Sequence, residues 1–246
     1  MCVHLRSVKI AGLILLFCLL PSYGQKGTGT KGDFSVFGSH LVTDEVVKDN
    51  PYSAEGISEI TQTLRNGSKR SRKFITHFYR SEDGRIRLEE NIISDRGIWA
   101  DSSHELRRIS VFDPSTRSGF VLDPQNMLVE HYNAGNSLKI PPNPASVSTK
   151  SLDPQVLDGL TIQGTRRTKV IPAGDLGNTL PIEIVDERWY SPDLRVVVMT
   201  KHSDPRLGNV VYQLTQIDRS EPPASLFEVP SGYHAVGNKP KTKDER

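Results

Sequence analysis

The chain has 246 residues, of which 31 are Lys or Arg and 29 are Asp or Glu, so its charge is nearly balanced. A balanced charge argues against a nucleic-acid partner, because nucleic-acid-binding proteins carry a clear basic excess. Hydrophobic residues make up 36% of the chain, and the length suits one larger domain or two small ones.

The first element along the chain is a short apolar segment. Arg6 and Lys9 precede an unbroken apolar run over residues 10–20, and small residues follow it. This order is typical of a cleavable secretory signal peptide, and the run is well short of the about 20 residues that span a bilayer. We therefore expect residues 1–24 to be a signal peptide, the protein to be periplasmic or secreted, and no transmembrane segment to remain after cleavage.

Both cysteines, Cys2 and Cys18, fall within this expected signal peptide. A lipoprotein with Cys18 as its mature N-terminus is disfavoured, because Phe17 stands where a small residue is needed. The mature chain would then lack cysteine, and we expect no disulfide, thiolate metal site or cysteine nucleophile. The signal peptide also contains two basic residues and no acidic one, so the mature charge is expected to be zero.

Residues 25–50 are expected to form a flexible N-terminal segment. Residues 27–32 match the Gly-x-Gly-x-x-Gly pattern of dinucleotide-binding proteins. That pattern functions between a strand and a helix, and no helical periodicity follows it here, so a flexible start is the better interpretation. At the other end, residues 236–246 are polar and are expected to be a disordered tail.

Alternation of apolar and polar residues predicts strands over most of the remaining chain. Segments 52–64 and 68–80 flank Asn66-Gly67, which predicts a hairpin with a type I′ turn. A third strand, 85–93, completes a meander with one face towards solvent. Further strands are predicted at 106–112, 118–122, 127–132, 160–171, 181–190, 194–201 and 210–219.

Residues 133–154 are rich in Asn, Ser, Gly and Pro, which predicts a long connection. Any helix in the mature chain is expected there or near residues 40–50. The fold class is therefore mainly β: an antiparallel open barrel (half-barrel) or sandwich with little helix, formed by residues 51–235.

The residues that could carry chemistry are scattered along the chain. Each histidine is isolated in sequence, and the closest candidate pair is His202 with Asp204. Adjacent carboxylates such as Glu89 and Glu90 point to opposite faces of a strand, so they are not expected to act together. We predict no catalytic residue, metal site or cofactor, although a metal site or a hydrolase site assembled from distant strands stays open.

Aromatic residues are the best candidates for a binding surface. On strands they form the core or, if the sheet curls without closing, the lining of a groove for an apolar, lipid-like or peptide ligand. The candidate ligand-binding residues are Phe74, Phe78, Phe112, Trp189 and Tyr212. An exported, non-enzymatic binding protein is the leading hypothesis.

A basic cluster flanks the first predicted hairpin, made of Lys69, Arg70, Arg72 and Lys73. Such charges protect an edge strand from aggregation, or they contact an anionic partner. This cluster motivates the alternative hypothesis, an interaction or scaffold module of the cell envelope that acts through sheet edges. The sequence indicates no particular oligomeric state.

Several motifs carry resemblances to known proteins. Residues 189–194, 201–206 and 212–217, with the earlier hairpin around 79–87, resemble a group of uncharacterised secreted proteins of Gram-negative soil bacteria. Serial strands that end in Leu-Phe-x-x-Pro-x-Gly-Tyr, residues 226–233, resemble the LolA and RseB fold. The second resemblance implies an antiparallel half-barrel with helices plugging an apolar concavity that receives lipid, and this chain departs from it in having little helix for a plug.

Overall fold

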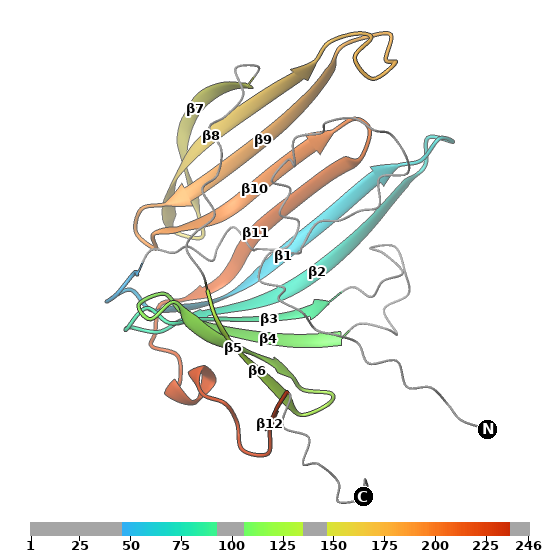
Figure 1. The fold of residues 1–246 in the computed structure, drawn as a ribbon. Coiled ribbons are helices and arrows are strands. Elements are labelled where there is room, and N and C mark those ends of the chain that lie inside the picture. The colour runs from blue at the N-terminus through green and yellow to red at the C-terminus, as the bar shows by residue number, and fades with distance from the viewer. Residues whose placement is uncertain (1–45, 93–105, 135–146, 237–246) are drawn as a thin grey trace, which may run out of the picture.

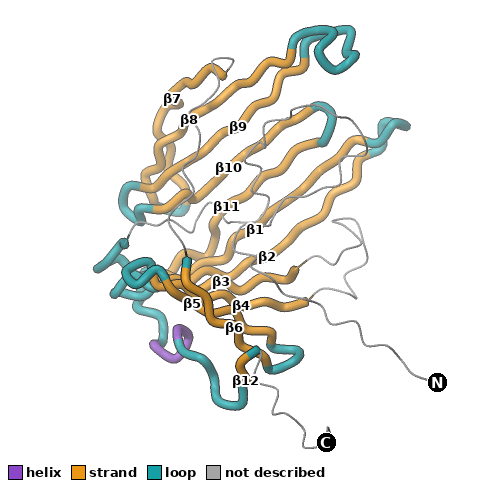
Figure 2. The backbone as a smooth tube through the Cα atoms, viewed as in Figure 1, coloured by secondary structure: helices purple, strands orange, loops and turns teal. Residues whose placement is uncertain are grey.

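The computed structural model describes residues 46–92, 106–134 and 147–236 (Figure 1). The expected signal peptide, most of the segment 25–50 and the tail from residue 237 lie outside this part. The described residues form one open 12-stranded sheet, which confirms the predicted mainly-β open half-barrel. Figure 2 shows long strands joined by short loops, with a single helical turn near β12.

Twelve strands follow one another through the described residues. They are β1 (Tyr52–Thr63), β2 (Lys69–Arg80), β3 (Ile86–Ile92), β4 (Leu106–Asp113), β5 (Ser118–Asp123), β6 (Leu128–Asn133), β7 (Val147–Leu157), β8 (Leu160–Ile171), β9 (Ile182–Ser191), β10 (Val196–Asp204), β11 (Gly208–Asp218) and β12 (His234–Ala235). A short 3₁₀ helix, η3 (Ala224–Phe227), precedes β12.

Two meanders make up the sheet. Their spatial order is β12-β6-β5-β4-β3-β2-β1-β11-β10-β9-β8-β7, so β1 to β6 extend to one edge and β7 to β11 return from the other. The meanders join where β1 pairs with β11. Every pairing is antiparallel except that of β12 with β6, which is parallel. Sequential antiparallel neighbours need only short turns, which explains the turn signals in the sequence.

The strand register assigns each side chain to one of two faces. Ser58 of β1 is paired with Phe74 of β2 and with Tyr212 of β11, so these three side chains share one face. Arg80 lies on the same face, and its Nη2 donates to the Leu194 carbonyl in the β9–β10 turn at 2.5 Å. In a flat sheet β2 and β10 would be about 14 Å apart, so an arginine reaches across only if the sheet curls towards this face. We call it the inner face.

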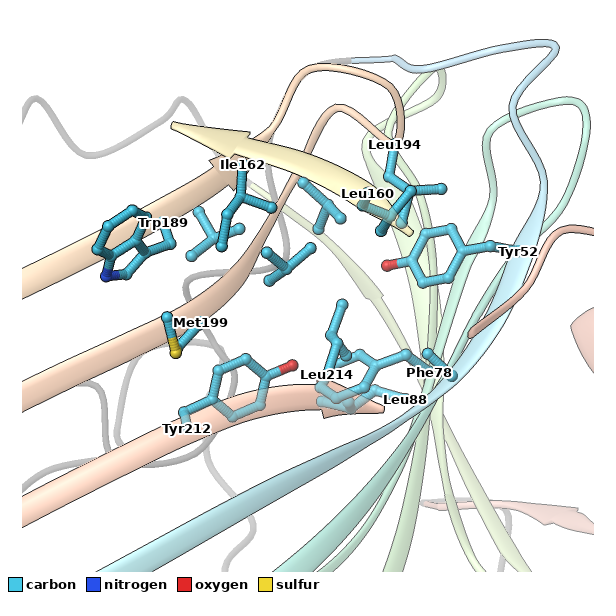
Figure 3. Close-up of a cluster of buried hydrophobic side chains, with 14 residues drawn as sticks. Tyr52, Phe78, Leu88, Leu160, Ile162, Trp189, Leu194, Met199, Tyr212 and Leu214 are labelled. Atoms are coloured by element: carbon cyan, nitrogen blue, oxygen red, sulfur yellow. The ribbon is translucent and has the colours of Figure 1, made fainter. Parts of the chain in front are cut away.

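The main core lies inside this curve. Phe78 and Tyr212 meet edge to face, with their ring centroids 6.3 Å apart. Both rings lie over Gly56, where a Cβ atom would stand 2.6 Å from the Phe78 ring. In Figure 3, Tyr52, Phe78 and Leu88 lie on the side of β1–β3 that faces β8–β10. Residues 196–199 of β10 are all buried, so this strand is covered on both faces.

The first hairpin forms as predicted, but its turn is not type I′. Only Gly67 has a positive φ, of 81°, and its N–H donates to the Leu64 carbonyl. Asn66 instead uses its side-chain oxygen to accept from the Ser68 N–H at 3.0 Å. The result is a three-residue loop with glycine in the left-handed region. A type I′ geometry occurs at Asp158-Gly159, where φ is 47° and 78°.

The Asp158-Gly159 turn connects β7 to β8, and β7 is a strand that was not predicted from the sequence. β7 covers most of the second half of the segment 133–154, which was predicted to be a connection. Its pairing with β8 shifts register between Leu152 and Gln155, the interval that contains Pro154. Proline is tolerated at such a bulge on an edge strand, so its presence did not exclude a strand.

Residues 46–50 also differ from the expectation of a flexible segment. Val47 is only 3% exposed, and the Asp49 N–H donates to the Glu82 carbonyl at 2.9 Å. Asn50 donates to the Asp193 carbonyl through its side chain and accepts from Arg80 through its own carbonyl. This short piece is therefore packed against two turns. No helix occurs in residues 46–50, 133–134 or 147–154, the described parts of the two segments in which one was expected.

Candidate binding surfaces of the sheet

Four of the five predicted ligand-binding aromatics share the inner face. Phe74, Phe78 and Tyr212 belong to it. Phe112 also belongs to it, because inner-face Arg80 is paired with Ile86, and Ile86 is paired with Phe112. The strand register sets Trp189 on the opposite, outer face, because its neighbour Arg188 is paired with inner-face Thr200 of β10, but its side chain belongs to the same buried cluster as Phe78 and Tyr212. All five side chains are buried, between 1% and 8% exposed.

Phe112 forms a second aromatic contact near the edge of the sheet. Its ring stacks on Tyr132 with centroids 6.4 Å apart and planes 8° from parallel. Tyr132 reaches Phe112 across Gly119, whose missing side chain leaves room for the tyrosine ring. The Tyr132 hydroxyl donates to the Val111 carbonyl, and burial raises its pKa to about 12.

Charged groups border the apolar part of the inner face. The Arg72 guanidinium lies 5.0 Å from the centre of the Phe74 ring. Glu90, which is 8% exposed, forms an ion pair with Arg108 of the neighbouring strand. The inner face therefore combines an apolar centre with a charged border at one end.

His202 and Asp204, the closest candidate pair in the sequence, bind other partners. His202 Nδ1 lies 2.6 Å from Oδ1 of Asp186 on β9, whereas Asp204 binds Arg206 in the following turn. Cross-strand register, rather than nearness in sequence, selects the histidine's partner. In contrast, Glu89 and Glu90 point to opposite faces as predicted: Glu89 bonds Arg87 and Arg107, and Glu90 bonds Arg108.

The basic cluster of the first hairpin is divided between the two faces of β2. Arg70 and Arg72 share the inner face with Phe74, and Lys69 and Lys73 lie on the outer face. Lys73 is 3.7 Å from Glu59, and Arg70 donates to the side chain of Gln62. The four charges therefore do not form one continuous patch.

The predicted solvent-facing side of the first meander is partly covered. Arg87 and Glu89 on its outer face are 6% and 7% exposed. Arg87 Nη1 donates to the Leu226 carbonyl of η3 at 2.5 Å. The C-terminal segment thus packs on this side of β3–β6, a contact between residues about 140 positions apart that strand periodicity cannot predict.

A cavity of about 390 Å³ lies on this side, between η3 and the ends of β4–β6. This cavity was not predicted from the sequence. Its lining combines aromatic rings with charged and amide groups: Arg85, Val111, Asp113, Ser118, Gly119, Phe120, His131, Tyr132, Asn133 and Phe227. The only sequence signal that points to it is the Leu-Phe-x-x-Pro-x-Gly-Tyr segment, which supplies Phe227.

The described residues contain neither a cluster of metal-ligating side chains nor a helix that could span a membrane. Within residues 46–92, 106–134 and 147–236, no three His, Cys, Asp or Glu side chains gather closely enough to hold a metal ion. In the same part of the chain, no helix has the length and apolar character needed to cross a bilayer.

No family model matches the chain, and no curated protein matches it. Solved structures of similar fold include an uncharacterised conserved protein from Thermus thermophilus, with 8% identity over 76% of this chain and 90% of that one and a TM-score of 0.44. MucB in the MucA/MucB complex of Pseudomonas aeruginosa has 11% identity over 76% of this chain and 58% of its own, with a TM-score of 0.41. A LolA superfamily protein from Nitrosomonas europaea has 9% identity over 75% and 93%, with a TM-score of 0.31. A LolA superfamily protein and MucB are thus among the solved structures to which the chain is distantly similar.

Proposed function

We propose that this chain is an exported, non-enzymatic envelope protein that binds a lipid-like or peptide ligand on the inner face of its sheet. The observation that carries the proposal is the gathering of Phe74, Phe78, Phe112 and Tyr212 on the inside of one open, curved sheet. Export rests on the signal peptide expected in residues 1–24. The binding domain would be residues 51–235.

The physical basis is the burial of apolar surface. Each square ångström of apolar surface removed from water contributes about 25 cal/mol, so an acyl chain or an apolar peptide side chain gains most where aromatics cluster. The charged border near Phe74, with Arg72 and the Glu90–Arg108 pair, would hold a polar head. Because these aromatics are buried, a ligand reaches them only as the inner face opens.

The test is to purify the protein from the periplasm of an expressing cell, extract bound lipid and record a native mass spectrum. We expect an adduct with the wild type and loss of that adduct in Phe74→Glu. The matched control is Ile75→Glu, since Ile75 lies one residue away on the outer face and is 52% exposed. Phe74→Leu, which keeps the site apolar, should retain the adduct if Phe74→Glu misfolds. An adduct absent from the wild type would contradict the proposal.

A second candidate is an interaction module that acts through a sheet edge. In the described residues β7 has a strand partner on one side only, and residues 148–151 and 153–156 are exposed, with Val156 at 74%. An exposed edge offers backbone groups to an extended peptide. Cross-linking in cells from a photoreactive residue at Val156 would return a defined partner protein if this candidate is correct, and only lipid or nothing if it is wrong.

A further inference from the structure

We propose that the outer-face cavity beneath η3 binds a small zwitterion, namely an amino acid or a short peptide that carries an apolar side chain. The cavity lies on the opposite face of the sheet from the surface assigned above, so the two proposals are independent. Its volume of about 390 Å³ falls in the range of small-molecule pockets.

The cavity arises from a change of residue type along β4–β6. Ile109, Leu122 and Val129 form an apolar row on the outer face, and Val229 and Tyr233 of the C-terminal segment pack on it. Four residues nearer the ends of the strands, the row becomes polar. It consists of Asp113, Ser118 and Asn133 on β4–β6, and Arg85, the residue before β3, continues it. The C-terminal segment therefore packs on the apolar row and leaves a cavity over the polar row, beneath Phe227.

Arg85 supplies a positioned cation to this space. Its guanidinium lies 5.2 Å from the centre of the Phe227 ring, and its Nε donates to Asp83 at 2.9 Å. Asp83 is its only carboxylate partner among the described residues. The aromatic face and the bond through Nε fix the plane of the guanidinium, which leaves the terminal nitrogens for a carboxylate ligand.

Asp113 supplies a positioned anion. Its Oδ1 accepts from the Ser115 N–H at 2.8 Å, the Ser115 hydroxyl at 2.5 Å and the Thr116 N–H at 3.3 Å. Burial raises the pKa of Asp113, but these hydrogen bonds outweigh it and hold the pKa below its ordinary value. The carboxylate is therefore ionised at neutral pH, and its Oδ2 has no partner among the described residues.

Both charges line the same cavity at the end of the β3–β4 ladder, and they form no ion pair with each other. The register that pairs Ile86 with Phe112 places Arg85 opposite Asp113, yet Arg85 turns to Asp83. A ligand with one charge would satisfy one of the two groups and leave the other desolvated beside it. A zwitterion satisfies both, with its carboxylate at Arg85 and its ammonium at Asp113. Phe120 and Phe227 then form the walls for an apolar side chain.

The probes are the dipeptide L-phenylalanyl-L-alanine, its N-acetyl derivative and its C-terminal amide, each titrated by calorimetry into the purified protein. We expect the free dipeptide to bind, and each derivative, which lacks one charge, to bind about tenfold more weakly or worse. Arg85→Gln and Asp113→Asn should weaken the dipeptide by a similar factor. Asparagine preserves the capping bonds of the turn, so Asp113→Asn should fold.

Asp123→Asn is the matched control. Asp123 caps the next turn of the meander in the same way, accepting from the Gln125 and Asn126 N–H groups, but it does not line the cavity. Its variant should bind the dipeptide as the wild type does. The proposal is overturned if the dipeptide does not bind, if either derivative binds as tightly as the free dipeptide, or if Asp113→Asn and Asp123→Asn bind the dipeptide with the same affinity.

Discussion

Glycine positions inside strands show how single residues set the packing of the sheet. At Gly56 an added Cβ atom would meet the Phe78 and Tyr212 rings at 2.6 and 2.7 Å. At Gly119 it would meet the Val111 carbonyl oxygen at 2.2 Å and the Tyr132 ring at 2.8 Å. Rings can shift by a few tenths of an ångström, but a backbone carbonyl in a strand cannot do so without disturbing the sheet.

We therefore expect both Gly56→Ala and Gly119→Ala to lower the free energy of unfolding, by about 1–3 kcal/mol, with Gly119→Ala the more severe. Urea unfolding followed by circular dichroism measures both. Equal stability of Gly119→Ala and the wild type would contradict the close contact between Gly119 of β5 and the Val111 carbonyl of β4.

Asp204 provides a residue-level test of pH dependence. It is 2% exposed, and its carboxylate accepts three hydrogen bonds from Arg206. Burial raises the pKa of Asp204, but the hydrogen bonds and charge of Arg206 outweigh it and keep the pKa below its ordinary value. The folded state therefore favours the ionised carboxylate.

We expect Asp204→Asn to lose about 2 kcal/mol of stability at pH 7. Because the folded pKa lies below the unfolded value of about 3.9, this contribution is complete above that pH and is lost as the pH falls through the folded pKa. The difference in free energy of unfolding between the wild type and Asp204→Asn, measured in urea, should then be smaller at pH 3 than at pH 7. Asp218→Asn, an exposed carboxylate that caps Ser220, is the control and should change little at either pH.

At the scale of elements, the packing of η3 on β3 depends on one buried ion pair. Arg87 and Glu89 are 2.8 Å apart, and their side chains are 8% and 9% exposed. Arg107 binds the same glutamate at 2.5 Å, but its side chain is 55% exposed. Only Arg87 also bonds the Leu226 carbonyl of η3.

This arrangement predicts unequal effects for two arginines that share one carboxylate. Arg87→Met should cost about 3 kcal/mol of stability, because it removes a buried charge and the bond that holds η3. Arg107→Met should cost less than about 1 kcal/mol, as is usual for exposed pairs. Thermal unfolding of both variants measures the difference, and similar losses in the two would contradict the packing of η3 on β3.

The elements also show what the sequence could and could not reveal. Alternation along β2 placed Phe74 and Phe78 on one face correctly, because that pattern is local. Strand β7 was missed, because Pro154 and the surrounding polar residues also fit a loop, and only the pairing with β8 distinguishes them. Trp189 belongs to the same buried cluster as Phe78 and Tyr212, but a sequence does not reveal the cross-strand register that sets it on the opposite face from Tyr212. The cavity depends on three strands, on Arg85 and on η3 together, so no single segment predicts it.

At the scale of the whole molecule, two local meanders meet at the β1–β11 pair, and the Arg80 bond to Leu194 spans that junction. The curve that results gives the sheet two different surfaces. The inner face collects aromatics from both meanders, and the outer face receives the C-terminal segment over β3–β6. The proposed ligand site on the inner face depends on this curvature, which is why it is the central claim.

The most direct measurement of that claim places a photoreactive benzophenone side chain at Phe74 or at Ile75, one at a time, in protein expressed in cells. These neighbours point to opposite faces of β2. After irradiation and mass spectrometry, we expect a cross-linked lipid or peptide at position 74 and none at position 75. A ligand cross-linked only from position 75, or cross-links from position 74 that join only residues of the chain itself, would contradict binding on the inner face.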